Sequence, residues 1–249
     1  MSIIRVNHIS FTAQDTAVPL EVLNDISFQV VDDEFVCLLG PSGCGKSTLL
    51  NIISGMKQPD AGDIHFEGFH FEKPRLGMMF QRSTLMEWRT VERNLSLPLE
   101  LLKWNSAVIK DQVSAWIKRI DLTGFENYYP SNLSGGMAQR VSLARALIHD
   151  PEYLLFDEPF GALDAMTREQ MSVELLEVWQ QKKKPIIMVT HSISEAVLLA
   201  DKIVIMSKRP GQIVKEVMNP FPRPRHRELR YTEEFLELSR EVHEILVSN

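Results

Sequence analysis

Residues 40–48 read Gly40-Pro41-Ser42-Gly43-Cys44-Gly45-Lys46-Ser47-Thr48, and this stretch decides the fold. A glycine, four further residues and then Gly-Lys-Ser is the spacing of a loop that binds phosphate groups. The loop follows the apolar run Phe35–Leu39 and precedes the helical run Thr48–Ile53, so the sequence predicts a strand, the loop and then a helix. An accidental glycine-rich turn is the alternative, and the flanking strand and helix argue against it.

The loop pattern predicts a nucleotide-binding chemistry. Glycines let backbone N–H groups fold around phosphate oxygens, and the helix that follows presents its positive end to them. Lys46 is expected to reach the β- and γ-phosphates, and the Ser47 hydroxyl is expected to bind Mg²⁺.

A second acidic stretch supplies what such a loop needs for its metal ion. The apolar run Tyr153–Phe156 ends in Asp157 and Glu158. Asp157 is expected to hold Mg²⁺, and Glu158 is placed to act as general base toward the attacking water. A strand that ends in a solvated acidic turn is the alternative, and the presence of the phosphate loop argues against it.

Composition and charge exclude several classes of protein. The 249 residues are 44% hydrophobic and 24% charged, which is typical of a globular chain with one large domain or two small ones. No apolar run approaches the roughly 20 residues that span a bilayer, and Met1–Arg5 begins no signal peptide, so we expect a cytosolic protein. The net charge of −6 is a poor match for a nucleic-acid backbone.

The order of strand-like and helical runs predicts an α/β core with a parallel sheet. The first 84 residues contain strand candidates, a helical block follows, and strand candidates alternate with helices from residue 153. The expected strands are Val22–Val30, Glu34–Leu39, Gly62–Phe66, Leu76–Phe80, Tyr153–Phe156, Pro185–Thr190 and Lys202–Met206. The expected helices lie near 90–103, 107–120 and 134–148, and a further one carries Leu163, Met166, Met171, Leu175 and Val178 at helical spacing.

The last 30 residues have a different pattern. Pro220, Pro222 and Pro224 alternate with arginines, which predicts an extended linker. Phe235, Leu238, Val242 and Ile245 then mark an amphipathic helix, whose simplest role is packing and whose alternative role is a regulatory or dimer contact.

A third motif shows a family resemblance. Leu133-Ser134-Gly135-Gly136-Met137-Ala138-Gln139-Arg140 resembles the signature motif of the ATP-binding-cassette (ABC) ATPases, with Met137 where Gln is usual. The remaining elements of that family follow in order. Gln81 resembles the Q-loop glutamine that contacts the metal or water, Gly161-Ala162-Leu163-Asp164 resembles the D-loop, and His191 resembles the switch histidine that contacts the γ-phosphate.

The resemblance implies a P-loop NTPase of the ABC-ATPase cassette fold, an α/β core with an inserted helical subdomain and an antiparallel β subdomain. The cassette would occupy residues 1–219, with its core at about 1–84 and 151–219 and the helical subdomain at about 85–150. Residues 220–249 would hold the Pro/Arg linker and the C-terminal helix. The cofactors implied are ATP and Mg²⁺, with the metal held by Ser47, Gln81 and Asp157.

The resemblance also implies the assembly. Two cassettes, either a homodimer or this chain paired with a relative, would associate head to tail, so that ATP lies between the P-loop of one chain and Leu133–Met137 and Asp164 of the other. Lys46, Gln81, Glu158 and His191 would carry the chemistry. The family stacks adenine on an aromatic residue near the first strand, where Phe11 and Ala13 are alternatives.

Three stretches resemble importers of the nitrate/sulfonate/taurine type: residues 85–91, residues 160–170 and residues 207–211, together with the Pro/Arg tail. This type implies a transmembrane permease, a soluble substrate-binding protein and a peripheral place on the cytoplasmic face of the inner membrane. No nucleic-acid partner is expected. The alternatives are a soluble cassette that acts on DNA or ribosomes, and a regulatory cassette that binds ATP without hydrolysing it, which would be expected to lack Glu158 or His191.

Overall fold

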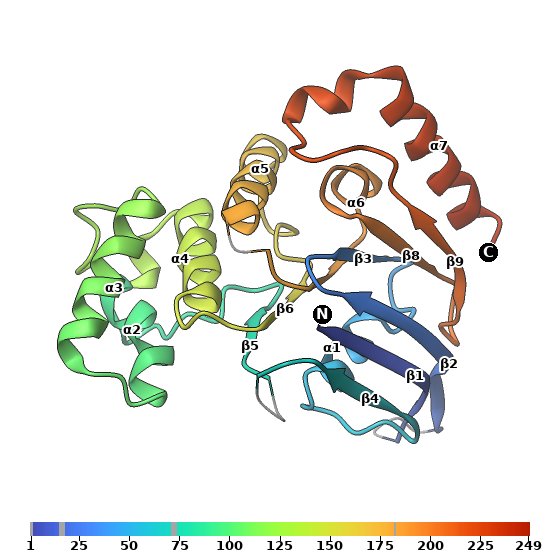
Figure 1. Cartoon of the computed structure of the whole chain (residues 1–249), viewed down its shortest axis with the longest axis horizontal. Coiled ribbons are helices and arrows are strands. Elements are labelled where there is room, and N and C mark those ends of the chain that lie inside the picture. Colours follow the sequence, from blue (N-terminus) through green and yellow to red (C-terminus); the bar gives the residue numbers. More distant parts are fainter. Residues whose placement is uncertain (1, 15–17, 71–73, 182) are drawn as a thin grey trace.

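A computed structural model describes residues 2–14, 18–70, 74–181 and 183–249. It contains two sheets, a three-stranded antiparallel sheet in the order β2-β1-β4 and a six-stranded sheet in the order β5-β6-β7-β3-β8-β9 (Figure 1). The strands are β1 Ile3–Ala13, β2 Leu20–Val31, β3 Phe35–Leu39, β4 Ala61–Glu67, β5 Leu76–Met79, β6 Tyr153–Asp157, β7 Ile186–Thr190, β8 Lys202–Met206 and β9 Ile213–Met218. Strands β5, β6, β7, β3 and β8 run parallel, and β9 pairs with β8 antiparallel.

The six-stranded sheet is apolar on both faces because both faces are covered. Strand β3 shows this directly. Phe35 and Cys37 belong to one buried cluster, whereas Val36 and Leu38 belong to the other.

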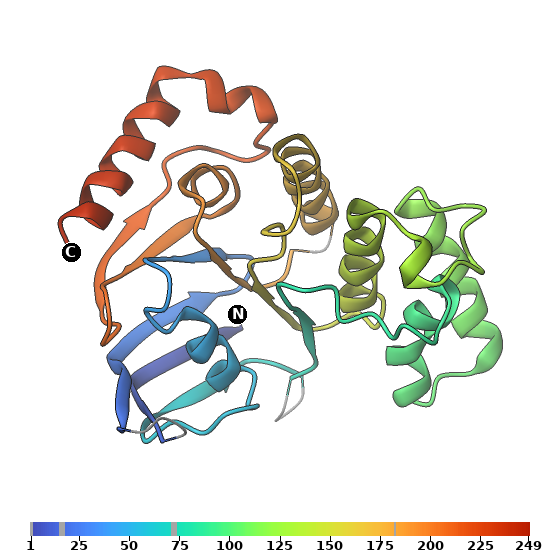
Figure 2. The ribbon, with the colours of Figure 1, turned by 180° about the vertical axis from the view of Figure 1, so that it is seen from behind.

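Helices cover the two faces differently. Helix α1, Lys46–Ile53, lies between the two sheets and packs into the same cluster as β1 and β2. The opposite face carries α5, Ala165–Gln181, α6, Ile193–Leu199, and α7, Glu233–Val247 (Figures 1 and 2).

A separate helical region stands at one end of the sheet (Figure 1). It consists of α2, Val91–Leu101, α3, Ser106–Arg119, and α4, Gly135–Leu147, which share a third buried cluster. Helix α4 also sends Leu143 and Ala146 into the cluster under the sheet. This helix therefore joins the helical region to the core.

The structure contains β1 and β9, which are not among the expected strands, and it differs from the expectation at α5 and β5 as well. Leu163 precedes α5, and Met166 is 83% exposed, so these two residues are not part of the buried face of that helix. Strand β5 ends at Met79, one residue before the predicted end. Leu163 lies outside the helix because Asp164 caps its start: the Asp164 carboxylate accepts hydrogen bonds from the backbone N–H groups of Met166 and Thr167. Met166 is in the helix but lies five residues before Met171, whereas side chains on one helix face are three or four residues apart.

The Pro/Arg segment is packed against the core. It contains no regular strand, as predicted for an extended segment, yet Arg225 is only 4% exposed. Arg223 Nε and Arg225 Nη2 lie 2.8 and 3.0 Å from Asp201 Oδ1, and Arg225 also donates to the carbonyl of Ala200 at 2.6 Å. The segment therefore fixes the start of the C-terminal region to the end of α6.

Helix α7 follows a short 3₁₀ turn, Arg227–Tyr231. Its Phe235, Leu238 and Val242 are buried in the cluster of α5 and α6, as its apolar spacing predicted. Within the described residues, none of the helices has both the length and the apolar character needed to cross a membrane.

Candidate active site

The glycine-rich loop joins β3 to α1, as the sequence predicted. Gly45 is the N-cap of α1 and adopts a φ of 107°, a left-handed backbone conformation that residues with a Cβ rarely adopt. A Cβ on Gly45 would lie 2.6 Å from Leu23 Cδ2 of β2. The loop therefore depends on glycine at this position both for its backbone conformation and for its contact with the antiparallel sheet.

Lys46 is directed back along this loop. Its ammonium group donates to the carbonyl oxygens of Gly40 at 2.7 Å and Pro41 at 2.9 Å, and the residue is 5% exposed. A cation held against two carbonyls at the loop is positioned to exchange these contacts for phosphate oxygens.

Ser47 and Asp157 lie together although they are far apart in the sequence. The Ser47 hydroxyl donates a hydrogen bond to Asp157 Oδ1 at 2.8 Å. Burial raises the pKa of Asp157, and the Ser47 hydrogen bond opposes that shift. Two adjacent hard oxygen donors, one of them a desolvated carboxylate, fit the ligand preference of Mg²⁺.

Glu158 is held from two sides. The Gln81 side-chain amide donates to Glu158 Oε2 at 3.0 Å, and His191 Nδ1 lies 3.3 Å from the same oxygen. Glu158 has a φ of 45°, which is uncommon for a residue other than glycine. The side chain is thus oriented by partners from two other strand ends.

Strand order explains why these residues meet. Gln81 follows β5, Asp157 ends β6, His191 follows β7 and the glycine-rich loop follows β3. These four strands are consecutive neighbours in the sheet and run parallel, so their carboxyl ends share one edge.

Arg209 is a residue of this site that sequence reasoning missed. Its Nε and Nη2 donate to the carbonyl of Gly43 at 3.0 and 2.7 Å. The segment around it lies close to the loop, since a Cβ on Gly211 would be 2.2 Å from the Cys44 carbonyl oxygen. The sequence marked residues 207–211 only as a subgroup resemblance, and no local pattern predicts a contact across 166 residues.

A cavity of about 280 Å³ opens over the loop. Its lining comprises loop residues, Glu158, Arg209, and Leu20 and Val22 of β2. Phe11 is not among these described lining residues, and its ring lies under the Lys57 ammonium at 4.6 Å. Ala13 pairs with Leu20 in the sheet. Leu20, the strand partner of Ala13, lines the cavity. Which residue stacks on adenine, Phe11 or Ala13, stays a prediction.

The signature residues line a different cavity, of about 340 Å³. Ser134 caps α4 by accepting a hydrogen bond from the Met137 N–H at 3.2 Å. Gly135, Gly136 and Asp164 lie beside it, but Leu133 does not line this cavity. Hydrogen bonds from Thr167, first of all from its side chain, lower the pKa of Asp164.

One chain does not bring the two cavities together. Their described lining residues have no member in common. Gln139 of α4 connects the regions of the two cavities inside the chain. Its buried side-chain amide donates a hydrogen bond to the carbonyl of Pro159, the residue after Glu158.

Comparison with known proteins identifies the family. The family model described as "ABC transporter" matches residues 23–161. The aliphatic sulfonates import ATP-binding protein SsuB of Bacillus cereus is 44% identical over 241 residues, which cover 96% of this chain and 94% of that protein. The nitrate import ATP-binding protein NrtD of Synechococcus elongatus is 40% identical over 215 residues, which cover 84% of this chain and 78% of that protein.

A solved structure agrees with the fold. It is a dimeric ATP-binding cassette in a post-hydrolysis state bound to ADP and Pi, with a TM-score of 0.76 and 27% sequence identity. It covers 88% of this chain and 100% of its own. The predicted cassette fold and the resemblance to importer ATP-binding subunits are therefore confirmed.

Proposed function

The chain belongs to the ABC transporter family as a transport-coupled ATPase, and we propose that it energises the uptake of a small anionic solute through a separate membrane permease. The solute class, nitrate, sulfonate or taurine, is inferred from what the relatives import. The observation that carries the proposal is the set of hydrolytic residues at one sheet edge, with Glu158 Oε2 held by Gln81 and His191 beside the Ser47–Asp157 pair.

Each group has a task that its geometry supports. Lys46 binds the β- and γ-phosphates in place of the Gly40 and Pro41 carbonyls. Glu158 accepts the proton of the attacking water, while Gln81 and His191 keep its carboxylate in place. Ser47 and Asp157 would hold Mg²⁺, which supplies positive charge to the phosphate oxygens when bound.

A second cassette completes the site in this proposal. The loop cavity contains the hydrolytic groups, and the cavity at Ser134 presents a helix N-terminus, which favours an anion. A head-to-tail homodimer would place the second cavity of one chain over the loop of its partner. The dimeric cassette that matches this fold supports such an assembly.

A groove between the core and the helical region suits the permease. It has a volume of about 580 Å³ and an apolar wall that includes Met86, Leu97 and Leu101. Leu101 is 74% exposed and the adjacent Leu102 is 43% exposed, and both line the groove, so its apolar wall is open to a partner. The groove lies next to Gln81, because Phe80 and Met86 line it and Gln81 donates a hydrogen bond to Glu158. Residues 80–86 therefore connect the groove to the hydrolytic residues, which supports coupling of permease movement to hydrolysis.

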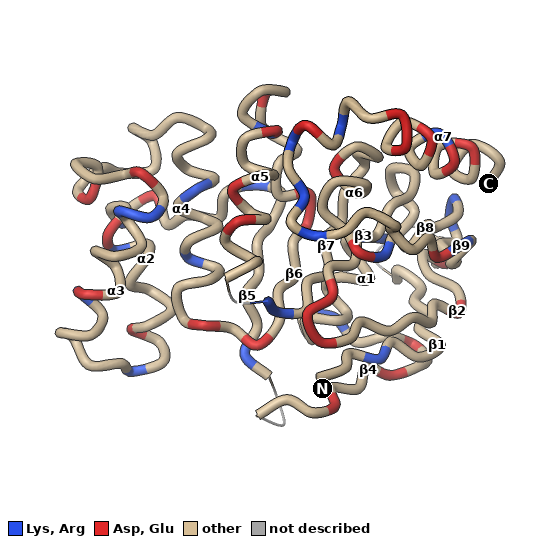
Figure 3. Tube along the Cα trace, turned by 45° about the horizontal axis from the view of Figure 1, so that its top comes forward, with Lys and Arg blue, Asp and Glu red and all other residues tan. Residues whose placement is uncertain are grey.

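A peripheral place on the cytoplasmic face of the membrane follows from this docking, with the substrate-binding protein reached only through the permease. Nothing favours the alternative of a soluble cassette that acts on DNA or ribosomes. Basic residues are interspersed with acidic ones along the described chain (Figure 3), and the net charge is −6.

The test is a pull-down of the tagged protein from gently solubilised membranes, with mass spectrometry of what co-purifies. We expect a polytopic membrane protein in stoichiometric amount. Leu101→Glu should lose that protein and keep ATP binding in solution, whereas Leu236→Glu, which changes another exposed leucine, on α7, should lose neither. Ribosomal proteins or nucleic acid in place of a permease would refute the importer proposal.

A further inference from the structure

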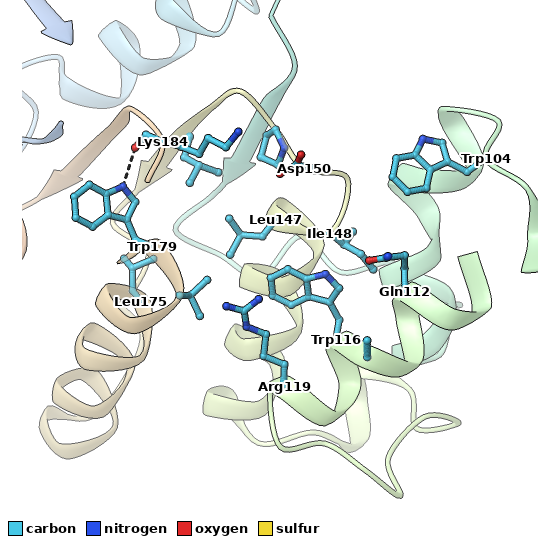
Figure 4. Close-up of a pocket in the computed structure, with 14 residues that line it drawn as sticks. Trp104, Gln112, Trp116, Arg119, Leu147, Ile148, Asp150, Leu175, Trp179 and Lys184 are labelled. Carbon is cyan, nitrogen blue, oxygen red and sulfur yellow. Dashed lines mark hydrogen bonds between the residues drawn. The ribbon is translucent and has the colours of Figure 1, made fainter. Parts of the chain in front are cut away.

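A further cavity lies between the helical region and α5, and its described lining shares no residue with the cavity at the loop or the cavity at Ser134. It has a volume of about 360 Å³, which is within the range of small-molecule sites. Figure 4 shows Trp116 and Arg119 of α3 on one side of it and Leu175 and Trp179 of α5 on the other.

The walls of this cavity are held in place. The indole N–H of Trp179 donates to the Lys184 carbonyl at 2.7 Å, and the Arg223 guanidinium lies over its ring at 4.1 Å. The edge of Trp179 meets Phe35 with ring centroids 5.9 Å apart. Because this wall needs no rearrangement, a ligand would lose little binding free energy to ordering it.

The lining combines an apolar floor with positive charge. Leu147, Leu154, Leu175 and Val178 form the floor, and Trp104 and Trp116 add aromatic surface. Of the charged groups that line the cavity, Arg119 and Lys184 are cationic and Asp150 is anionic.

Arg119 is the group best placed to bind an anion. Its guanidinium lies 4.8 Å from the centroid of the Trp116 ring and donates to the Gln181 side-chain carbonyl. A guanidinium has five N–H donors, so further donors remain for a carboxylate or sulfonate. Stacking on Trp116 and bonding to Gln181 also orient the group across the opening toward α5 (Figure 4).

We propose that this cavity binds a small amphipathic organic anion, with its apolar body on the leucine and valine floor beside Trp116 and its carboxylate or sulfonate on Arg119. Two sources share this chemistry: aromatic anions and alkyl sulfonates. The proposal is independent of the proposed function, because binding is measured without turnover.

Isothermal titration calorimetry on the full chain tests it, with 2-naphthalenesulfonate as the probe. We expect binding that excess ATP does not displace, which separates this cavity from the adenine site. The neutral compound 2-naphthol should bind at least about tenfold more weakly, since it lacks the charge for the guanidinium. A competition with 1-hexanesulfonate then distinguishes the sources, because displacement of the probe points to alkyl sulfonates and its absence to aromatic anions.

Two variants localise the site. Arg119→Gln should weaken binding about tenfold or more, whereas Lys118→Gln, which removes the same charge from the neighbouring exposed position of α3, should change it less than twofold. Trp116→Leu should weaken binding as well, and Arg119→Gln remains decisive where that variant fails to fold. The proposal is overturned by no binding at millimolar probe, by displacement with ATP, or by equal losses in the Arg119 and Lys118 variants.

Discussion

The cavity at the glycine-rich loop and the cavity at Ser134 are built in different ways. We call them the loop half and the signature half of the proposed ATP site. The loop half draws Gln81, Lys46, Asp157, Glu158 and His191 from the ends of four parallel strands. The signature half is mainly one helix N-terminus, capped by Ser134, with Asp164 beside it. The comparison teaches that side chains from distant segments need a sheet to bring them together, whereas a helix N-terminus, which favours an anion, forms locally.

The largest expected effect tests whether the loop half carries hydrolysis. Glu158→Gln should lower ATP turnover by about 10²-fold or more, because the general base is lost, and it should keep ATP binding. Turnover by malachite-green phosphate release and binding by calorimetry measure the two effects. Glu177→Gln, on the exposed side of α5, is the control. Near-normal turnover of Glu158→Gln would remove this residue from the role.

The next prediction tests whether the two halves meet in trans. Lys46→Ala and Ser134→Arg should each be inactive alone, but an equal mixture should recover up to about a quarter of the normal turnover. Random pairing makes half of the dimers mixed, and each mixed dimer has one intact composite site. Phosphate release after co-refolding or co-expression measures it. A mixture as inactive as its components would argue against the shared site.

A smaller effect concerns binding by the loop half alone. Lys46→Ala should raise the Kd for ATP about tenfold or more, because the ammonium contact to the phosphates is lost. Calorimetry with ATP measures this, and Lys110→Ala on the exposed side of α3 is the control. An unchanged affinity would count against the loop as the phosphate site.

Arg209→Gln should have a weaker effect, raising the Kd for ATP about threefold to tenfold. Its two hydrogen bonds to the Gly43 carbonyl hold the loop in shape, and their loss leaves the phosphate contacts themselves in place. Lys208→Gln removes the same charge from the adjacent exposed position. Equal effects of the two variants would show a general charge effect in place of the loop contact.

The smallest expected effect is on the pH dependence of the free energy of unfolding, and it concerns Thr190 and Glu195 beside His191. The Thr190 hydroxyl donates to Glu195 at 2.6 Å, and burial raises the pKa of Glu195 above its ordinary value of 4.5. The folded chain therefore holds a proton that the unfolded chain has released, so the free energy of unfolding falls as pH rises through this window and levels off above the raised pKa.

Urea unfolding from pH 4.5 to neutral pH checks this sign. Glu195→Gln should show a shallower fall in the free energy of unfolding over that range than the unmodified chain. Glu237→Gln, at an exposed position of α7, should show the unmodified slope. A Glu195→Gln slope equal to that of the unmodified chain would contradict the assignment.

Local patterns predicted much of the fold. The apolar spacing of Phe235, Leu238 and Val242 predicted α7, and the glycine-rich loop was placed correctly between β3 and α1. Spacing failed at Leu163 because a capping interaction of Asp164, and not the apolar period, determines where α5 starts. Composition predicted an extended segment at 220–226, but only the structure shows that Asp201 binds its arginines.

The sequence by itself determined the phosphate loop, the paired acids at 157 and 158 and the alternation of strands and helices. These are local features, since each depends on residues that are neighbours in the chain. Tertiary structure decided that Ser47 meets Asp157 across 110 residues, that Gln81 meets Glu158 across 77 and that Arg209 meets Gly43 across 166. Such contacts follow from strand order and from the packing of distant segments, which no local pattern of side chains specifies.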